Sequence, residues 1–205
     1  MTTLSVPDGR ALLPDGLEIT ESRLRLLTVA VQLFGDRGYP GVSMRDLAEG
    51  LGIKSASLYA HVPSKQHLLF EVMRIGLVEH AQVLRLALLE APSDPAEQVR
   101  ALVRAHVLMA LQRPSLTRVI THELKHLEEP FLGDVQLLRD QPAQYFLEVV
   151  DRGCRLGTFD VVNPRLSLRA IADMGFRLAE WPRPAGSDEE IVDSYQRFAL
   201  RLLTS

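Results

Sequence analysis

The sequence predicts an all-α fold. Apolar residues recur at helical spacing almost throughout, as in Leu24, Leu27, Val31 and Phe34, and no segment has the alternating β-branched pattern of strands. Serine residues stand where helix N-caps are preferred, and glycine or proline stands where helices end. With 205 residues and 46% hydrophobic content, the chain can bury two cores of unequal size.

The first helices can be placed from these signals. Residues 1–19 contain turn residues without periodicity, and we expect them to form a flexible arm. A first helix is expected near 20–36. Ser43 is positioned to cap a second helix, with Asp46 completing an acidic capping box, and Gly52 supplies the tight turn that follows.

A third and a fourth helix follow at once. Ser55 is expected to cap the third, which must stop by His61 or Val62 because the residue before Pro63 is disfavoured in α geometry. Ser64 caps the fourth helix, which runs toward about residue 89.

The rest of the chain, residues 67–205, is predicted to form a second helical domain. The expected elements are a loop at 91–95, a fifth helix after it, a sixth between Pro114 and Pro130, a helical interval at 131–156 with a break or kink at Pro142, a loop at 157–163, a helix at 164–180, a loop at 182–187 and a last helix at 188–203.

Two short capped helices across a glycine turn indicate a helix-turn-helix within residues 20–66, whose second helix would enter a DNA major groove. Arg45 and Lys65 each fall in a first helical turn, where the helix dipole disfavours a cation by roughly 0.3 to 1 kcal/mol. A backbone phosphate would offset that cost. The small side chains of Ser55 and Ser57 would let the third helix approach base edges closely.

The stretch VAVQLFGDRGYPGVSMRDLAEGLGIKSASLYAHVPSKQHLL, residues 29–69, resembles the N-terminal DNA-binding domain of TetR-family repressors. Val62 departs conservatively from the Phe found there in many members. The resemblance implies a homodimer that binds double-stranded operator DNA. It also implies a set of residues at the DNA face, namely Ser43, Arg45, Lys54, Ser55, Ser57, Tyr59, His61 and Lys65.

Three later segments resemble a subgroup of the family whose members often respond to acyl-CoA thioesters, although others bind different ligands. They are THELKHLEEP (121–130), GCRLGTFDVVNPRLSLRAIADMGFRLAEWPRP (153–184) and SDEEIVDSYQRFALRLL (187–203). A small, mostly apolar effector is therefore expected, with an acyl-CoA as one candidate. The candidate pocket residues are His106, Met109, Tyr145, Phe146, Met174 and Trp181, each of which could equally belong to the core or surface.

Apolar stripes on the last two expected helices favour a four-helix dimer interface, which the resemblance also implies. The candidate interface residues are Leu166, Ile171, Leu178, Ile191, Tyr195, Phe198 and Leu202. The alternative is that these stripes simply cover the core of one subunit.

His122, Glu123 and His126 spell H-E-x-x-H, the pattern of zinc hydrolases. Such an enzyme also needs a third ligand and a sheet that aligns its substrate, but no strand is predicted and Glu148 is only the nearest candidate ligand. We therefore expect no catalysis, metal or cofactor. A zinc hydrolase and a helical adaptor without DNA binding stay open as alternatives.

The composition of the chain argues against several classes of protein. A net charge of −3 argues against indiscriminate nucleic-acid binding. The single cysteine, Cys154, excludes an intramolecular disulfide. No apolar stretch approaches the ~20 residues that a membrane-spanning helix needs. A cytoplasmic protein without a membrane partner is expected.

Overall fold

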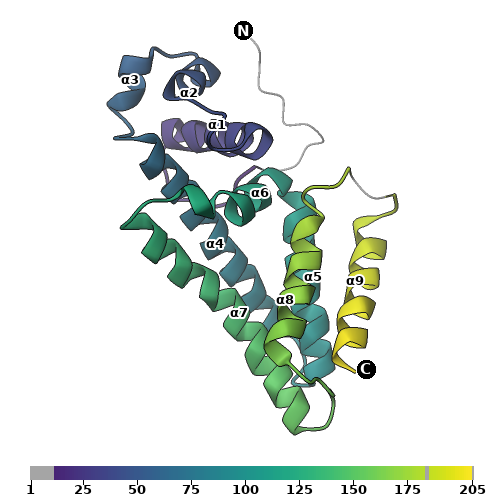
Figure 1. Cartoon of the computed structure of the whole chain (residues 1–205). Helices are drawn as coiled ribbons and strands as arrows, with labels where there is room; N and C mark the ends of the chain where they lie inside the picture. The colour runs from purple at the N-terminus through teal and green to yellow at the C-terminus, as the bar shows by residue number, and fades with distance from the viewer. Residues whose placement is uncertain (1–11, 183–184, 205) are drawn as a thin grey trace. The chain divides into compact units, whose positions relative to one another are not determined.

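The computed structural model describes residues 12–182 and 185–204. Within those ranges the chain is helical and has no β-strand (Figure 1), which confirms the predicted all-α class. In chain order the helices are α1 (Glu21–Arg37), α2 (Met44–Leu51), α3 (Ser55–Tyr59), α4 (Lys65–Glu90), α5 (Pro95–Gln112), α6 (Pro114–His122), the 3-10 helix η2 (Leu124–His126), α7 (Phe131–Arg155), α8 (Pro164–Arg177) and α9 (Asp188–Leu203). None of the described helices is both long enough and apolar enough to cross a bilayer.

The chain divides into two compact units. The first unit consists of Met1–Leu77 and Gln112–Gln136, and the second of Val78–Leu111 and Leu137–Ser205. This division differs from the predicted boundary between residues 66 and 67, because α6, η2 and the start of α4 belong with the first three helices.

Contacts between α1 and α6 explain the difference. A Cβ atom at Gly35 would lie 2.9 Å from the Cβ of Ser115, so a side chain at this position of α1 would clash with α6. Arg118 also donates a hydrogen bond of 2.8 Å from Nε to the carbonyl of Gly35. This close packing joins segments that are about 80 residues apart, and a periodicity read along the chain does not reveal it.

Local sequence signals account for the helices of the first unit. Ser43 and Asp46 form the predicted capping box at the start of α2. Gly52 ends α2 with φ 70° and ψ 28°, a left-handed conformation that glycine adopts without a Cβ penalty. Helix α3 ends at Tyr59, within the limit imposed by Pro63, but the prediction that Ser55 caps this helix was wrong, because Lys54 is the N-cap residue and no side chain makes a cap hydrogen bond.

The core of the first unit is formed by the apolar stripes. Its fully buried side chains include Leu27, Phe34, Leu47, Leu58 and Leu68. Each such side chain contributes roughly 1.5 to 3 kcal/mol when it leaves water. This burial, rather than the intrinsic helix propensity of five to eight residues, stabilises α2 and α3.

The described part of the predicted arm, residues 12–19, is partly packed. Leu13 is buried, and a carboxylate oxygen of Asp15 lies 3.8 Å from Nη2 of Arg113. Burial within the first unit removes the apolar side chain of Leu13 from water, which is favourable. Residues 1–11 of the predicted arm lie outside the described residues.

The second unit contains α5, α8 and α9, and parts of α4 and α7. Helix α9 has the predicted bounds, whereas α8 ends at Arg177 rather than near residue 180. Helix α7 continues through Pro142, so of the predicted break or kink the break is absent. A proline removes one helical hydrogen bond, but burial of Phe146, Val149 and Val150 in the following turns holds the helix in place.

Candidate DNA-binding and ligand-binding sites

Helices α2 and α3 form the predicted helix-turn-helix, and α3 presents its polar side outward. Tyr59 is 56% exposed, whereas Leu58 beside it is fully buried. Of the eight predicted DNA-facing residues, Ser43, Arg45, Lys54, Ser57, Tyr59 and His61 are exposed, and Ser55 and Lys65 are half-buried. Ser55, Ser57 and Tyr59 belong to α3 itself, whereas Arg45 lies on α2 and Lys65 on α4, and the contact of all eight residues with DNA stays a prediction.

The start of α2 combines a structural cap with an available cation. The side chain of Ser43 accepts a hydrogen bond from the backbone N–H of Asp46, whose carboxylate accepts one of 2.7 Å from the N–H of Ser43. Hydrogen bonds from Ser43 lower the pKa of the Asp46 carboxyl. Arg45 is exposed and makes no ion pair within the described ranges, so its charge is free to meet an anion.

Lys65, for which the sequence suggested a phosphate partner, already has partners within the first unit. Its Nζ donates hydrogen bonds of 2.9 Å to the carbonyl of Tyr39 and 2.7 Å to that of Val42, and lies 4.0 Å from the centre of the Tyr39 ring. Burial lowers the pKa of this amine. Lys65 therefore ties the start of α4 to the α1–α2 connection, and its contact with DNA through a third donor stays a prediction.

Arg23 is a positioning residue that sequence reasoning missed. Its guanidinium donates a hydrogen bond of 3.0 Å to the carbonyl of His61 and pairs with the carboxylate of Glu71. It thereby connects α1, the end of α3 and α4. Its place on a helical face gave no signal beyond that of an ordinary surface charge.

The H-E-x-x-H segment does not lie on one helix. His122 is the last residue of α6, Glu123 connects the helices, and His126 closes η2, so the one-face spacing of two zinc ligands is lost. His126 Nδ1 lies 2.9 Å from Oε2 of the buried Glu123. Across the part of the chain that the structure describes, no three His, Cys, Asp or Glu side chains are grouped to hold a metal ion.

The segment instead braces the first unit. The ring of His126 stacks on Tyr39 with 5.8 Å between ring centroids, and the carbonyl of His126 accepts a hydrogen bond of 2.7 Å from Gln66 Nε2. Gln66 Nε2 also lies 3.0 Å from the Tyr39 hydroxyl. Together with Lys65, these side chains hold the start of α4 between η2 and the end of α1.

The candidate ligand site in the second unit contains a buried histidine pair. His80 Nε2 lies 2.9 Å from His106 Nδ1, and His106 Nε2 lies 3.0 Å from the carbonyl of Ala172. Since a carbonyl only accepts, His106 carries its proton on Nε2 and accepts a hydrogen bond from His80. Burial lowers the pKa of both imidazoles, well below the usual value for His80. His80 was not among the predicted residues.

Aromatic rings surround this pair. The His106 ring lies 4.5 Å from that of Phe176 and 6.5 Å from that of Phe146, between centroids. A Cβ at Gly175 would fall 2.3 Å from Cδ2 of His106, so only glycine allows α8 to approach so closely. The structure therefore brings His106 and Phe146 together in an otherwise apolar core.

The other predicted pocket residues differ in how deeply they are buried. Met109 is buried, Tyr145 and Met174 are half-buried, and Trp181 is 55% exposed. Their part in a ligand site stays a prediction.

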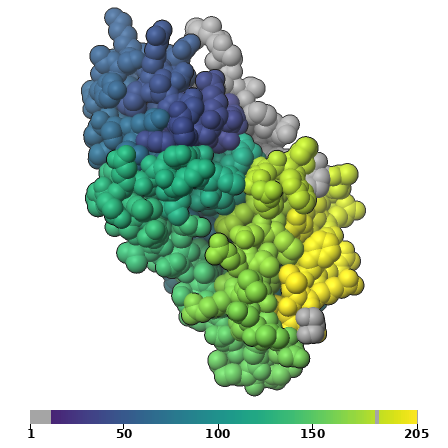
Figure 2. All heavy atoms as spheres, in the orientation of Figure 1, coloured from purple at the N-terminus to yellow at the C-terminus, as the bar shows by residue number. Residues whose placement is uncertain are grey.

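The predicted dimer residues fall into two groups. Ile171, Leu178 and Ile191 are buried within the second unit, where they cover the core of one subunit. Leu166, Phe198 and Leu202 are exposed, and Tyr195 is half-buried with its ring 5.8 Å from that of Phe198. Helices α8 and α9 lie side by side at the surface drawn in Figure 2, and the part of the exposed residues in a dimer interface stays a prediction.

Two protein-family models match the chain. Residues 26–72 match the model described as "Bacterial regulatory proteins, tetR family". Residues 92–203, more than half of the chain, match the model described as "Tetracyclin repressor-like, C-terminal domain".

Individual relatives cover most of the molecule. The HTH-type transcriptional repressor KstR2 of Rhodococcus jostii (strain RHA1) is 28% identical over 168 residues, which are 80% of this chain and 81% of KstR2. The crystal structure of the TetR family transcriptional regulator PfmR from Thermus thermophilus is 30% identical, with a TM-score of 0.77 over 88% of this chain and 100% of PfmR. AibR in complex with isovaleryl coenzyme A and operator DNA shares the fold, with 24% identity and a TM-score of 0.78 over 87% of this chain and 97% of AibR.

Proposed function

The chain belongs to the TetR family of bacterial transcription regulators, and from that premise we propose that it is a homodimeric repressor that binds a palindromic operator and is released by a small, largely apolar effector. The main observation in support of the proposal is the exposed polar face of α3, where Tyr59 is exposed to solvent and the neighbouring Leu58 is buried. The relative KstR2 is named a transcriptional repressor, which supports repression rather than activation as the function of this chain.

In this proposal α3 enters the major groove. Ser55 and Ser57 are small enough for the helix to approach base edges, and Tyr59 offers a hydroxyl to a base or phosphate. Arg45 at the start of α2 supplies a charge for the phosphate backbone. Two copies of α3, ~34 to 36 Å apart in a dimer, would read successive half-sites of one palindrome.

The dimer would form through the exposed apolar residues of α8 and α9. Leu166 is 65% exposed, Phe198 47% and Leu202 40%, and association would remove these side chains from water. A two-fold axis through this face would use the same patch on both subunits.

The effector would bind in the second unit near His106 and Phe146. Aromatic side chains there provide apolar contact, and the two histidines are the polar groups that an otherwise apolar site uses to orient its ligand. An acyl-CoA is the first candidate class, because AibR, which shares the fold, is described in complex with isovaleryl coenzyme A. Release from DNA requires that the effector bind the DNA-free conformation more tightly.

Selection of duplexes from random DNA by the purified protein, at two salt concentrations, tests the proposal. A palindromic site whose binding weakens steeply with salt is expected, because phosphate contacts release counterions. That duplex would then be used to screen acyl-CoA thioesters and other apolar ligands for release. Failure of the dimer to enrich any sequence would reject the repressor function.

A further inference from the structure

Helix α3 is held in the first unit mainly by apolar burial. It has five residues, fewer than the ~12 to 15 that an isolated helix needs, and no side chain caps its start. Leu58 within the helix and Val62 just after it are fully buried. Because the free energy of apolar burial is non-directional, these two side chains fix where α3 lies more strongly than the angle at which it lies.

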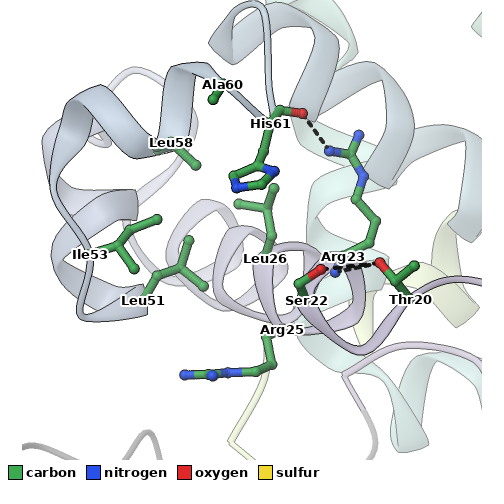
Figure 3. Close-up of a pocket in the computed structure, with 10 residues that line it drawn as sticks. All are labelled: Thr20, Ser22, Arg23, Arg25, Leu26, Leu51, Ile53, Leu58, Ala60 and His61. Carbon is green, nitrogen blue, oxygen red and sulfur yellow. Dashed lines mark hydrogen bonds between the residues drawn. The ribbon is translucent and has the colours of Figure 1, made fainter.

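A groove of about 420 Å³ lies between the start of α1 and the end of α3 (Figure 3). Its lining residues come from the first turns of α1 on one side, among them Arg23 and Leu26. On the other side they come from the end of α2 and from α3, among them Leu51 and Leu58. Close packing between α1 and α3 would oppose a tilt of α3, but the open groove lacks those contacts.

Arg23 bridges this groove. Its Nη1 donates a hydrogen bond of 3.0 Å to the carbonyl of His61, two residues after the end of α3, and Figure 3 marks this bond with a dashed line. Among the described residues, Arg23 is the only one outside residues 54–62 that makes a hydrogen bond to this segment. The bond therefore fixes the distance between α1 and the end of α3 where packing does not.

Glu71 on α4 orients the Arg23 guanidinium for this bond. Arg23 Nε donates a hydrogen bond of 2.9 Å to Oε1 of Glu71, and Arg23 Nη2 pairs with Oε2 of the same carboxylate. Pairing at two points fixes the plane of the guanidinium, which leaves Nη1 directed at the carbonyl of His61. Because the charge of Arg23 is already paired within the first unit, this arginine has no need of a phosphate partner.

We propose that Arg23, oriented by Glu71, is a positioning residue that sets the angle of α3 and thereby determines how well the protein discriminates its operator from other DNA. This inference rests on the proposed repressor function. Hydrogen bonds to base edges require a fixed approach of α3 to the major groove, whereas contacts with phosphates carry no sequence information. Loss of the bridge should therefore weaken specific binding more than non-specific binding.

The test measures dissociation constants by fluorescence anisotropy, for the selected operator and for a random duplex of the same length, between about 50 and 200 mM salt. The proteins are the wild type, Arg23→Gln, Glu71→Gln and the variant that carries both changes. Arg25→Gln is the matched control, because it removes the same charge from the same helix, and Arg25 is exposed without an ion pair in the part of the chain that the structure describes. Circular dichroism establishes that each protein is folded at the assay temperature.

Arg23→Gln should weaken operator binding by about fivefold or more, the size of one lost base contact, and should leave binding of the random duplex nearly unchanged. The salt slope should stay the same, because no phosphate contact is lost. Glu71→Gln should reduce the ratio of the two affinities less than Arg23→Gln does. The double variant should lose no more of this ratio than Arg23→Gln alone, because Glu71 acts through Arg23. Arg25→Gln should keep the ratio of the wild type.

An unchanged affinity ratio for folded Arg23→Gln would overturn the inference, as would an equal loss of affinity for both duplexes. A salt slope lowered by about 0.9 or more would also overturn it, because Arg23 would then contact a phosphate itself. Additive losses from Arg23→Gln and Glu71→Gln would show that the carboxylate does not act through the guanidinium.

If Arg23→Gln does not fold, the affinity ratio of Glu71→Gln decides, and a ratio equal to that of the wild type overturns the inference. A wild type that selects no duplex rejects the repressor function itself. That result differs from a wild type that selects an operator and whose Arg23→Gln variant discriminates equally well.

Discussion

In the first unit Arg45 on α2, Lys54 at the start of α3 and Tyr59 on α3 are exposed, whereas in the second unit His80 and His106 are buried among aromatic rings. Exposed groups keep their hydration until a partner replaces it, so changing them should alter binding while leaving stability nearly unchanged. Buried polar groups depend on each other for hydrogen bonds, so changing one should alter stability first. The two candidate sites should therefore respond in opposite ways to substitution.

The largest effect is expected for His106→Ala. The substitution leaves a cavity and removes the hydrogen-bond partner of the buried His80, so the free energy of unfolding should fall by roughly 3 to 4 kcal/mol. Urea denaturation followed by circular dichroism measures it. Operator affinity of the remaining folded dimer should stay within a few-fold of the wild type. A loss below about 1 kcal/mol would show that this pair is not a packed element of the second unit.

A pH effect should follow from the same pair. Burial lowers the pKa of both imidazoles, so the unfolded chain binds protons more readily than the folded one. The stability contribution is therefore complete above the unfolded pKa of about 6.5 and is lost as pH falls below it, by at most about 1.4 kcal/mol per pH unit for each histidine.

Urea unfolding at pH 7.5 and 5.5 checks this dependence, with a His80→Gln, His106→Gln double variant as the control. The wild type should lose more stability than the double variant over this interval. Equal losses in the two proteins would assign the pH dependence to other groups.

A different response is expected for Tyr59→Ala in the first unit. The side chain is 56% exposed, so the free energy of unfolding should change by less than about 0.5 kcal/mol. Operator binding should weaken by about 1 to 3 kcal/mol, the usual cost of one lost specific contact. Anisotropy with the selected operator measures the second quantity. A Tyr59→Ala variant that loses stability and keeps its affinity would contradict the expectation that exposed residues of the first unit affect binding rather than stability.

The smallest effect is expected where His126 of η2 packs on Tyr39. His126→Ala removes the ring stacked on Tyr39, so the start of α4 should be held less firmly and operator affinity should fall about tenfold or less, a coupling on the order of 1 kcal/mol. The salt slope should not change, because no phosphate contact is lost. Lys125→Ala is the matched control, since Lys125 is exposed in the same turn. A similar loss in both variants would argue against a brace.

Sequence reasoning succeeded where the signal was local. The Ser43 capping box and the Gly52 turn each depend on residues within a few positions, and both are present as predicted. The same reasoning expected a break or kink at Pro142, where burial of later turns keeps α7 continuous. It expected a backbone phosphate to offset the charge of Lys65 and did not reveal the carbonyls of Tyr39 and Val42 that accept its hydrogen bonds, because they are more than 20 positions away.

By itself, the sequence determined the all-α class, the helix-turn-helix and the exposed side of α3, because caps, turns and apolar periodicity act within one or two helical turns. The tertiary structure decided which unit α6 joins, that H-E-x-x-H is split between α6 and η2, and that His80 pairs with His106. Those outcomes depend on close packing between segments distant in the chain, such as Gly35 against Ser115, where the space available is set by both partners at once.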